Sequence, residues 1–359
     1  MQKKLIALAI AGLVSAPAFA QSNVTIYGIA DAYMGFGSHG DNDVAAVQSG
    51  GLSGSRLGFR GTEDLGNGLK AVFTLEQGFN IDDGSGLGNA SRQAFVGLGG
   101  SWGTVSLGRQ YAPGYDFQYD ALLSSAISPQ AILSGDAGST IAPNSDARWD
   151  NSIAYNGSFS GLKVRAIYAM SAGESTETTA AAPGVWSDPS DDDRFGLGLE
   201  YGNGPLKVGA VYHYIKDSVG TVATDDQTEW LVGGSYNFGF LTLAASYQDA
   251  EAIDNVRGAD GDLWQVGVIV PVGAAGNVHV AYGELDADNV IGTQSAKAKS
   301  YTLAYTHALS KRTTAYAGWN RTDNDTGLDF GAINDLDKTG LRNGGEEADL
   351  FVVGVRHAF

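Results

Sequence analysis

Apolar and polar residues alternate along most of this 359-residue chain. The segments 69–76, 206–213 and 241–248 show the pattern clearly, with Leu69, Phe73 and Leu243 each on the apolar side of its segment. Successive side chains of a β-strand point to opposite faces, so each segment has one apolar and one polar face. The pattern predicts an all-β fold, but alternation alone does not say which face points inward.

Three other features favour a barrel whose apolar face meets lipid. The segments run about 9–11 residues, the length of a tilted strand that crosses a bilayer. Short turns at 66–68, 202–204 and 309–311 alternate with long polar stretches at 38–53, 172–193 and 323–347. Charged residues such as Lys163 and Arg165 lie on the polar faces, and burying them unpaired in a dry core would cost several kcal/mol each. A water-filled lumen removes that cost.

The segments predict a 16-stranded antiparallel transmembrane β-barrel that occupies residues 21–359 as a single domain. An even number of strands brings both chain ends to the short-turn side, and closure leaves no unpaired strand edge in lipid. The predicted strands are 24–35, 55–64, 69–80, 92–99, 103–109, 150–156, 162–171, 194–201, 206–215, 229–238, 241–251, 262–272, 276–285, 298–308, 313–322 and 348–359.

The first twenty residues predict a signal peptide. Lys3 and Lys4 precede the apolar segment 5–14, and residues 18–20 (Ala-Phe-Ala) form a cleavage site of the A-x-A type. We expect cleavage after Ala20. The apolar segment is too short to span a bilayer, and no other stretch reaches about 18 consecutive apolar residues, so we expect no transmembrane helix.

The composition excludes several classes of function. The chain has 40 acidic and 22 basic residues, a net charge of -18, which becomes -20 when the two lysines of the signal peptide are removed. An acidic protein is a poor nucleic-acid binder, because neutralising phosphates requires clustered Lys and Arg. There is no Cys, which excludes disulfides and thiolate sites, and the five His are scattered. We expect no metal site and no cofactor.

Several motifs appear in order along the chain: 24–28 (VTIYG), 54–66 (GSRLGFRGTEDLG), 92–98 (RQAFVGL), 107–110 (LGRQ), 151–155 (NSIAY) and the C-terminal 354–359 (GVRHAF). Together they resemble the general diffusion porins of beta-proteobacterial outer membranes, of the neisserial and burkholderial type. The likeness covers essentially the whole mature chain. Phe359, at the end of an alternating last strand, looks like the outer-membrane assembly signal of such proteins.

The resemblance implies a homotrimer in the outer membrane of a Gram-negative bacterium, with passive diffusion of ions and small hydrophilic solutes through its pores. It also implies outer-membrane lipid and lipopolysaccharide as surroundings. The outer-membrane assembly machinery would recognise the C-terminal strand. It further implies that the third loop folds inward and narrows the pore.

The third loop is the largest departure from the alternating pattern. Residues 110–147 separate two predicted strands without clear alternation, and so long a loop in a compact fold is usually functional. A pore selects at its narrowest section, where charges lie closest to the permeant. We expect this constriction loop to supply the acidic side, with these candidates: Asp116, Asp120, Asp136 and Asp146.

Basic residues on the barrel wall are the expected counterpart. By strand parity, the residues that face inward are Arg56, Arg60, Lys70, Lys163, Arg165 and Lys207. By resemblance, Arg56, Arg92 and Arg148 match the family's constriction arginines, and the basic wall therefore comprises Arg56, Arg92, Arg148, Arg60 and Lys70. Arg109 shares the parity of lipid-facing Leu107, and its orientation stays open. The alternative is that each arginine only pairs locally with a wall carboxylate.

The prediction is a pore with a weak anion preference. Most of the acidic excess lies in the long loops, and charges farther from the constriction than about 8 Å are largely screened at physiological salt. A substrate-selective porin for an oligosaccharide or an organic acid is the alternative. A barrel enzyme and a structural or adhesive barrel are further alternatives. Residues 99–103 match G-x-S-x-G but lie in a predicted turn between strands rather than before a helix, so we do not expect an enzyme.

Overall fold

The computed structural model describes residues 23–88, 91–122, 125–134, 145–170, 193–216, 224–289, 295–331 and 345–359. The predicted signal peptide, residues 1–20, lies outside the described residues. The strands are β1 (Asn23–His39), β2 (Asn42–Ser49), β3 (Arg56–Gly66), β4 (Leu69–Gly78), β5 (Ser91–Gly100), β6 (Gly103–Tyr111), β7 (Arg148–Phe159), β8 (Leu162–Ala169), β9 (Arg194–Asn203), β10 (Leu206–Ile215), β11 (Gln227–Asn237), β12 (Thr242–Glu251), β13 (Asp260–Val272), β14 (Gly276–Asp288), β15 (Ala296–Ala308), β16 (Thr313–Asn324) and β17 (Ala348–Ala358).

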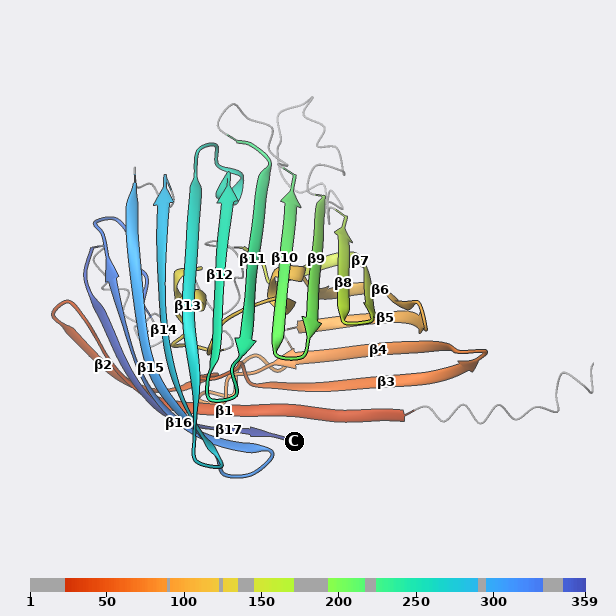
Figure 1. The fold of residues 1–359 in the computed structure, drawn as a ribbon, viewed down its shortest axis with the longest axis horizontal. Coiled ribbons are helices and arrows are strands. Elements are labelled where there is room, and N and C mark those ends of the chain that lie inside the picture. Colours follow the sequence, from red (N-terminus) through yellow and green to blue (C-terminus); the bar gives the residue numbers. More distant parts are fainter. Residues whose placement is uncertain are drawn as a thin grey trace, which may run out of the picture.

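The strands form one closed antiparallel sheet in which the first and last strands meet (Figure 1). β1 pairs with β17 from Ile29 opposite Ala358 to His39 opposite Ala348. Each of the sixteen predicted strands is present, which confirms the antiparallel barrel. The tight turn at 66–68 is also confirmed, because Gly66, Asn67 and Gly68 all have positive φ, of 85°, 53° and 79°.

β2 was not among the predicted strands. It pairs with residues 32–39 of β1, where Ala32 lies opposite Ser49. β3 pairs with residues 23–29 of β1, where Ile29 lies opposite Arg56. The two therefore occupy one position in the barrel and are separated by residues 50–55, which we call the excursion. The described strands thus make a 16-stranded barrel with one divided strand.

The apolar face of the wall is exposed, as predicted. Leu69, Leu75 and Leu243 have 37%, 52% and 39% of their surface exposed, and Phe351 and Val353 on β17 have 45% and 48%. Burying large apolar side chains is the main favourable contribution to folding, so a face that leaves them exposed requires an apolar surrounding such as lipid. No helix in the described parts of the chain is long and apolar enough to span a membrane.

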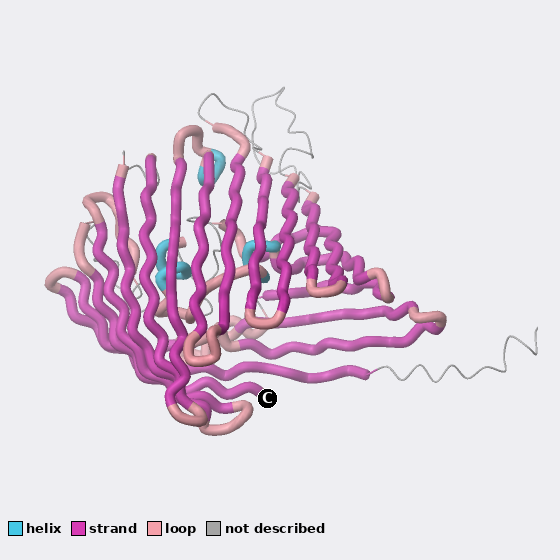
Figure 2. The backbone as a smooth tube through the Cα atoms, viewed as in Figure 1, coloured by secondary structure: helices cyan, strands magenta, loops and turns pink. Residues whose placement is uncertain are grey.

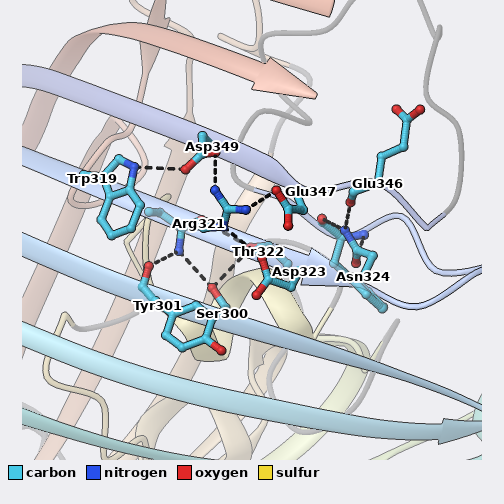
Figure 3. A network of polar contacts seen from close by, with 12 residues as sticks. Ser300, Tyr301, Trp319, Arg321, Thr322, Asp323, Asn324, Glu346, Glu347 and Asp349 are labelled. Carbon is cyan, nitrogen blue, oxygen red and sulfur yellow. Dashed lines mark hydrogen bonds and ion pairs between the residues drawn. The ribbon is translucent and has the colours of Figure 1, made fainter. Parts of the chain in front are cut away.

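Adjacent residues of β16 show the two faces at the long-loop rim (Figure 3). Trp319 donates from Nε1 to Asp349, and Arg321 forms ion pairs with Asp323, Glu347 and Asp349. Asn320, between them in sequence, points to the other face and donates to the hydroxyls of Ser300 and Thr302 and to the carbonyl of Tyr301. The period of two thus continues to the end of the strand.

Two short helices lie between β6 and β7 in sequence. α2 (Pro113–Asp116) contacts β8, β9 and β10, and α3 (Pro129–Leu133) contacts β13, β14 and β15 (Figure 2). A 3-10 turn, η1 (Ile253–Asn255), follows β12. The first helix of segment 110–147 thus lies near the strands next to β7, and the second helix lies against strands farther around the barrel.

Candidate functional site

The three arginines matched by resemblance meet in one patch on the polar face of the wall. Arg56 donates from Nε to the carbonyl of Gly54 at 3.0 Å, and a Cβ on Gly54 would lie 3.3 Å from Nη1 of Arg92. Arg92 donates from Nη2 to the hydroxyl of Tyr111 at 2.8 Å, and the guanidinium carbon of Arg148 lies 4.9 Å from the centre of the Tyr111 ring. Residues from β3, β5, β6 and β7 thus form one cluster, the arginine cluster.

A register shift turns Arg92 toward this cluster. On β5, Gln93 lies opposite Glu76 and Ser91 lies opposite Gln77, which leaves Arg92 without a cross-strand partner. Strict alternation would place Arg92 on the face of Leu98 and Val96. The bulge instead brings its Nε within 2.7 Å of the Glu76 carboxylate, which is almost fully buried.

A second shift, between Gly108 and Gln110 on β6, separates Arg109 from the cluster. Gly108 has a φ of 132°, and a Cβ there would lie 2.1 Å from the carbonyl oxygen of Ala94, so only glycine fits. Arg109 pairs with Asp150 at 2.7 Å. The side chain of Arg109, whose orientation parity left open, is therefore directed to Asp150 and not to the arginine cluster.

Tyr111 and Tyr115 stack with their ring centres 4.0 Å apart and their planes at 6°. Arg148 lies over both rings, at 4.9 Å from Tyr111 and 5.6 Å from Tyr115. Its Nε atom is buried and has no hydrogen-bond partner among the described residues. Neither tyrosine was predicted from the sequence to belong to the site.

Arg165 joins the same patch from β8. It pairs with Asp116 of α2 at 2.5 Å, donates to Asn156 at 2.9 Å, and donates to the backbone carbonyl of Tyr111. Parity placed Arg165 inward, but nothing in the sequence paired it with the constriction loop. Removal of the Asp116 carboxyl from bulk water raises its pKa, and the positive charges of Arg165 and Lys163 oppose that rise.

The other acidic residues predicted in the loop lie elsewhere. Asp120 is buried, and its carboxylate accepts from the backbone N–H of Leu122 and the hydroxyl of Ser128, both within the loop. Asp146 is exposed and pairs with Arg194 at 2.6 Å. Asp136 lies outside the described residues. Asp116 is thus the predicted loop carboxylate that the structure brings to the arginine cluster.

Arg60 and Lys70 lie on the polar face of β3 and β4, toward the short turns. The guanidinium carbon of Arg60 lies 5.0 Å from the centre of the Tyr27 ring, and neither cation has an ion pair among the described residues.

Lys163 on β8 pairs with Glu200 at 2.7 Å. A recess of about 460 Å³ follows this surface, and its polar lining comprises Asn23, Thr25, Arg60, Thr62, Thr74, Thr104, Ser106 and Asn156. We call the polar face of β3–β8 the open wall.

Described residues of the loop instead contact the polar face of β9–β16, and we call this face the covered wall. Its glycines leave the space that loop side chains fill, as at Gly198, where a Cβ would lie 2.3 Å from the ring of Phe117. Tyr119 occupies the corresponding space over Gly209 and Gly233. The glycines approached in this way are Gly196, Gly198, Gly209, Gly233, Gly267, Gly283 and Gly318.

Part of the covered wall is apolar, which differs from the uniformly polar lumen that alternation predicts. On β13 and β14, Leu263 and Leu285 are almost fully buried and belong to one cluster with Ile127 and Leu133 of the loop. The physical reason is that residues beneath the loop are shielded from water, so apolar side chains are favoured there.

Polar contacts fix the loop at two places. Near α2, the backbone N–H of Gly114 donates to Nε2 of His213 at 3.1 Å, and the other ring nitrogen contacts buried Glu229 at 2.9 Å. The acceptor role of Nε2 places the proton on Nδ1, which donates to the carboxylate. Farther along, the hydroxyl of Thr302 donates to the carbonyl of Ile127 at 2.6 Å.

The excursion holds the loop from the other side. The buried carboxylate of Asp31 accepts from the backbone N–H groups of Leu52 and Ser53, both at 2.9 Å, and from the hydroxyl of Tyr316 at 2.6 Å. The carbonyl of Gly51 accepts from the N–H of Ala126 at 3.0 Å. No sequence signal marked Asp31 as part of the site.

Phe359 lies at the seam between the chain ends. Its backbone N–H donates to Gly28 at 3.0 Å, and its carbonyl accepts from Gly28 at 3.1 Å. The side chain is 47% exposed on the apolar face. Its role as an assembly signal stays a prediction. Residues 99–103 span the turn between β5 and β6, as expected.

A family model, two related proteins and a solved structure that match this chain are all described as outer-membrane proteins or porins. The family model described as Gram-negative porin matches residues 7–327. The chain is 35% identical over 367 aligned residues to outer membrane porin protein 32 of Delftia acidovorans, covering all of both chains. It is 43% identical over 120 residues to major outer membrane protein P.IB of Neisseria gonorrhoeae, which covers 32% of this chain and 33% of that protein. The solved anion-selective porin from Comamonas acidovorans is 31% identical with a TM-score of 0.78, covering 94% of this chain and 100% of that one.

Proposed function

The chain belongs to the Gram-negative porin family, and from this premise we propose which residues set the ion preference of its channel. It is an outer-membrane β-barrel that forms a diffusion channel for ions and small hydrophilic solutes. The observation that carries the proposal is the arginine cluster beside the constriction loop.

In this proposal, residues 110–147 fold into the lumen and form one side of the narrowest section. Contacts of the described loop residues with the covered wall support it, as does the hydrogen bond from Ala126 to Gly51 at the excursion. The arginine cluster on β3, β5 and β7 forms the facing side. Ions that pass between the two sides meet charges at close range, where screening by salt is weakest.

The balance of charge at this section favours anions. Arg92 is paired with Glu76, and Arg165 is paired with Asp116. For these two arginines, local pairing with a carboxylate cancels most of the positive charge. Arg56 and Arg148 have no carboxylate partner among the described residues. Their uncancelled charges support an anion preference, and the name of the similar anion-selective porin from Comamonas acidovorans supports it too.

The experiment is a reversal-potential measurement in a planar bilayer under a salt gradient. We expect the double substitution Arg56→Ser and Arg92→Ser to lower the anion-to-cation permeability ratio several-fold, because it removes positive charge at contact distance. The matched control is Arg312→Ser, which removes the same kind of charge in the exposed turn between β15 and β16. An unchanged reversal potential in the double variant would contradict the proposal.

The assembly is also part of this proposal. We expect a homotrimer, with outer-membrane lipid and lipopolysaccharide around the apolar face and with the assembly machinery recognising the strand that ends in Phe359. Small side chains at Gly28, Ala30 and Ala32 on the apolar face of β1 would permit close packing of barrels. Cross-linking of the purified protein into a three-chain species is the expected result.

A further inference from the structure

Two kinds of partner hold the arginines around Tyr111. Arg92 is fixed by a carboxylate, Glu76 at 2.7 Å, and Arg165 by another, Asp116 at 2.5 Å. Arg148 has no carboxylate within ion-pair distance among the described residues and lies instead over the stacked rings of Tyr111 and Tyr115. The difference has an electrostatic consequence for each arginine.

A carboxylate that orients a guanidinium also cancels most of its charge for a passing ion. An aromatic ring attracts the guanidinium through its quadrupole and carries no net charge. A ring therefore orients an arginine while leaving its full positive charge available. At Arg148 this is the arrangement observed, with its Nε buried and unpartnered beside the rings.

The two rings differ in how firmly they are held. Tyr111 ends β6 and contacts three polar partners: its hydroxyl accepts from Arg92 and donates to Glu76, and its carbonyl accepts from Arg165. Tyr115, in α2, is half-buried, and it stacks on Tyr111 at 4.0 Å. Tyr115 thus extends a fixed aromatic surface from the wall into the loop.

We propose that Tyr115 is a positioning residue for ion selectivity, which holds the Arg148 guanidinium over the Tyr111–Tyr115 stack so that its charge faces the permeant without a neutralising carboxylate. The inference rests on the proposed function, because it assigns a part of the same constriction. It names an aromatic side chain, rather than another charge, as a determinant of anion preference.

The test compares Tyr115→Leu with Tyr115→Phe in the full-length protein. Leucine removes the ring and leaves every charge in place, and we expect the anion-to-cation permeability ratio to fall most of the way to the value of Arg148→Gln. Phenylalanine retains the ring face, and we expect it to keep the ratio of the unsubstituted protein. Tyr111 is not substituted, because its hydrogen bonds to Arg92 and Glu76 would be lost as well.

The double variant Tyr115→Leu, Arg148→Gln separates positioning from other effects. If Tyr115 acts through Arg148, adding the leucine to Arg148→Gln changes the ratio no further, because coupled residues are not additive. A further fall of the same size would overturn the inference. Heat-resistant migration on gels reports whether each variant forms a folded barrel. Only variants that pass this check are compared, and the Tyr115→Phe variant shows that substitution at this position does not by itself lower the permeability ratio.

The outcomes also distinguish the inference from the proposed function. If Arg148→Gln lowers the ratio and Tyr115→Leu does not, the positioning role is wrong and the constriction stands. If neither Arg148→Gln nor the Arg56→Ser, Arg92→Ser double variant changes the ratio, the constriction itself is wrong.

Discussion

The open wall and the covered wall belong to the same sheet and follow the same alternation, but their polar faces differ. On the open wall, Arg60, Thr74 and Asn156 border a recess. On the covered wall, Gly198, Gly233 and Gly318 leave room for loop side chains, and Leu263 and Leu285 are buried beneath the loop. One strand pattern therefore serves two environments, and the loop decides which side is dry.

The difference teaches how a long loop packs against the polar face of a barrel wall. Apolar and glycine positions give the loop a packed surface, as in a protein interior. The cations Arg60 and Lys70, which have no ion pair among the described residues, lie on the open wall. The arginine cluster lies on the open wall, where Arg165 pairs with Asp116 of the loop.

The strongest way to break the comparison is to remove the carboxylate that holds the excursion in place beside the loop. Asp31 holds the excursion, whose Gly51 contacts the loop and whose Gly54 contacts Arg56. We expect Asp31→Ala to destabilise the barrel by about 3 kcal/mol or more, because three donors lose their acceptor at roughly 1 kcal/mol or more each. The measurement is the temperature at which the folded band disappears on gels.

Tyr316→Phe is the matched control for Asp31, because it removes one of the three hydrogen bonds and keeps the carboxylate. We expect a loss of about 1 kcal/mol. Equal loss in the two variants would show that the backbone donors of the excursion do not depend on Asp31.

A smaller effect is expected from filling the space beneath the loop. A Cβ at Gly198 would lie 2.3 Å from Phe117, so Gly198→Val should move α2 toward the lumen, lower the single-channel conductance and cost about 1–3 kcal/mol. Gly202 lies on the same face of β9 with its nearest neighbour 3.9 Å from a Cβ. Gly202→Val should leave the conductance and stability near those of the parent. Similar effects at both positions would contradict the contact between Gly198 and the loop.

The smallest effect concerns pH at the contact between the open wall and the loop. Burial raises the pKa of Asp116 above that of an ordinary aspartate, so on acidification it is protonated before exposed carboxylates are. Loss of its negative charge leaves Arg165 uncancelled, and we expect the anion preference to increase. The reversal potential, measured as pH is lowered from neutrality, checks this.

Asp116→Asn removes the titrating group and sharpens the pH prediction. We expect this variant to have the higher anion preference at neutral pH and to lack the acid-induced increase. A variant that retained the full increase would assign it to other carboxylates.

The sequence determined the strand positions and the faces of most side chains. Each of the sixteen alternating segments is a strand, and parity placed Arg60, Lys163 and Arg165 on the polar face, as the register confirms. The reason is local: side-chain direction in a strand depends on position alone, and a lipid-facing surface forces a strict apolar period. β2 escaped prediction because apolar residues lie on both of its faces. Val44 and Ala46 share one face with Gln48, and Ala45 and Val47 lie on the other.

The tertiary structure alone decided how the site is assembled. The bulge at Arg92, the glycine at 108 that separates Arg109, and the contacts of Asp31, Tyr111 and Tyr115 depend on partners far apart in sequence. Likeness to known porins selected Arg56, Arg92 and Arg148, but alternation would have turned Arg92 outward. A two-residue period carries no information about register shifts or about which wall a long loop covers, because both are set by packing between distant segments.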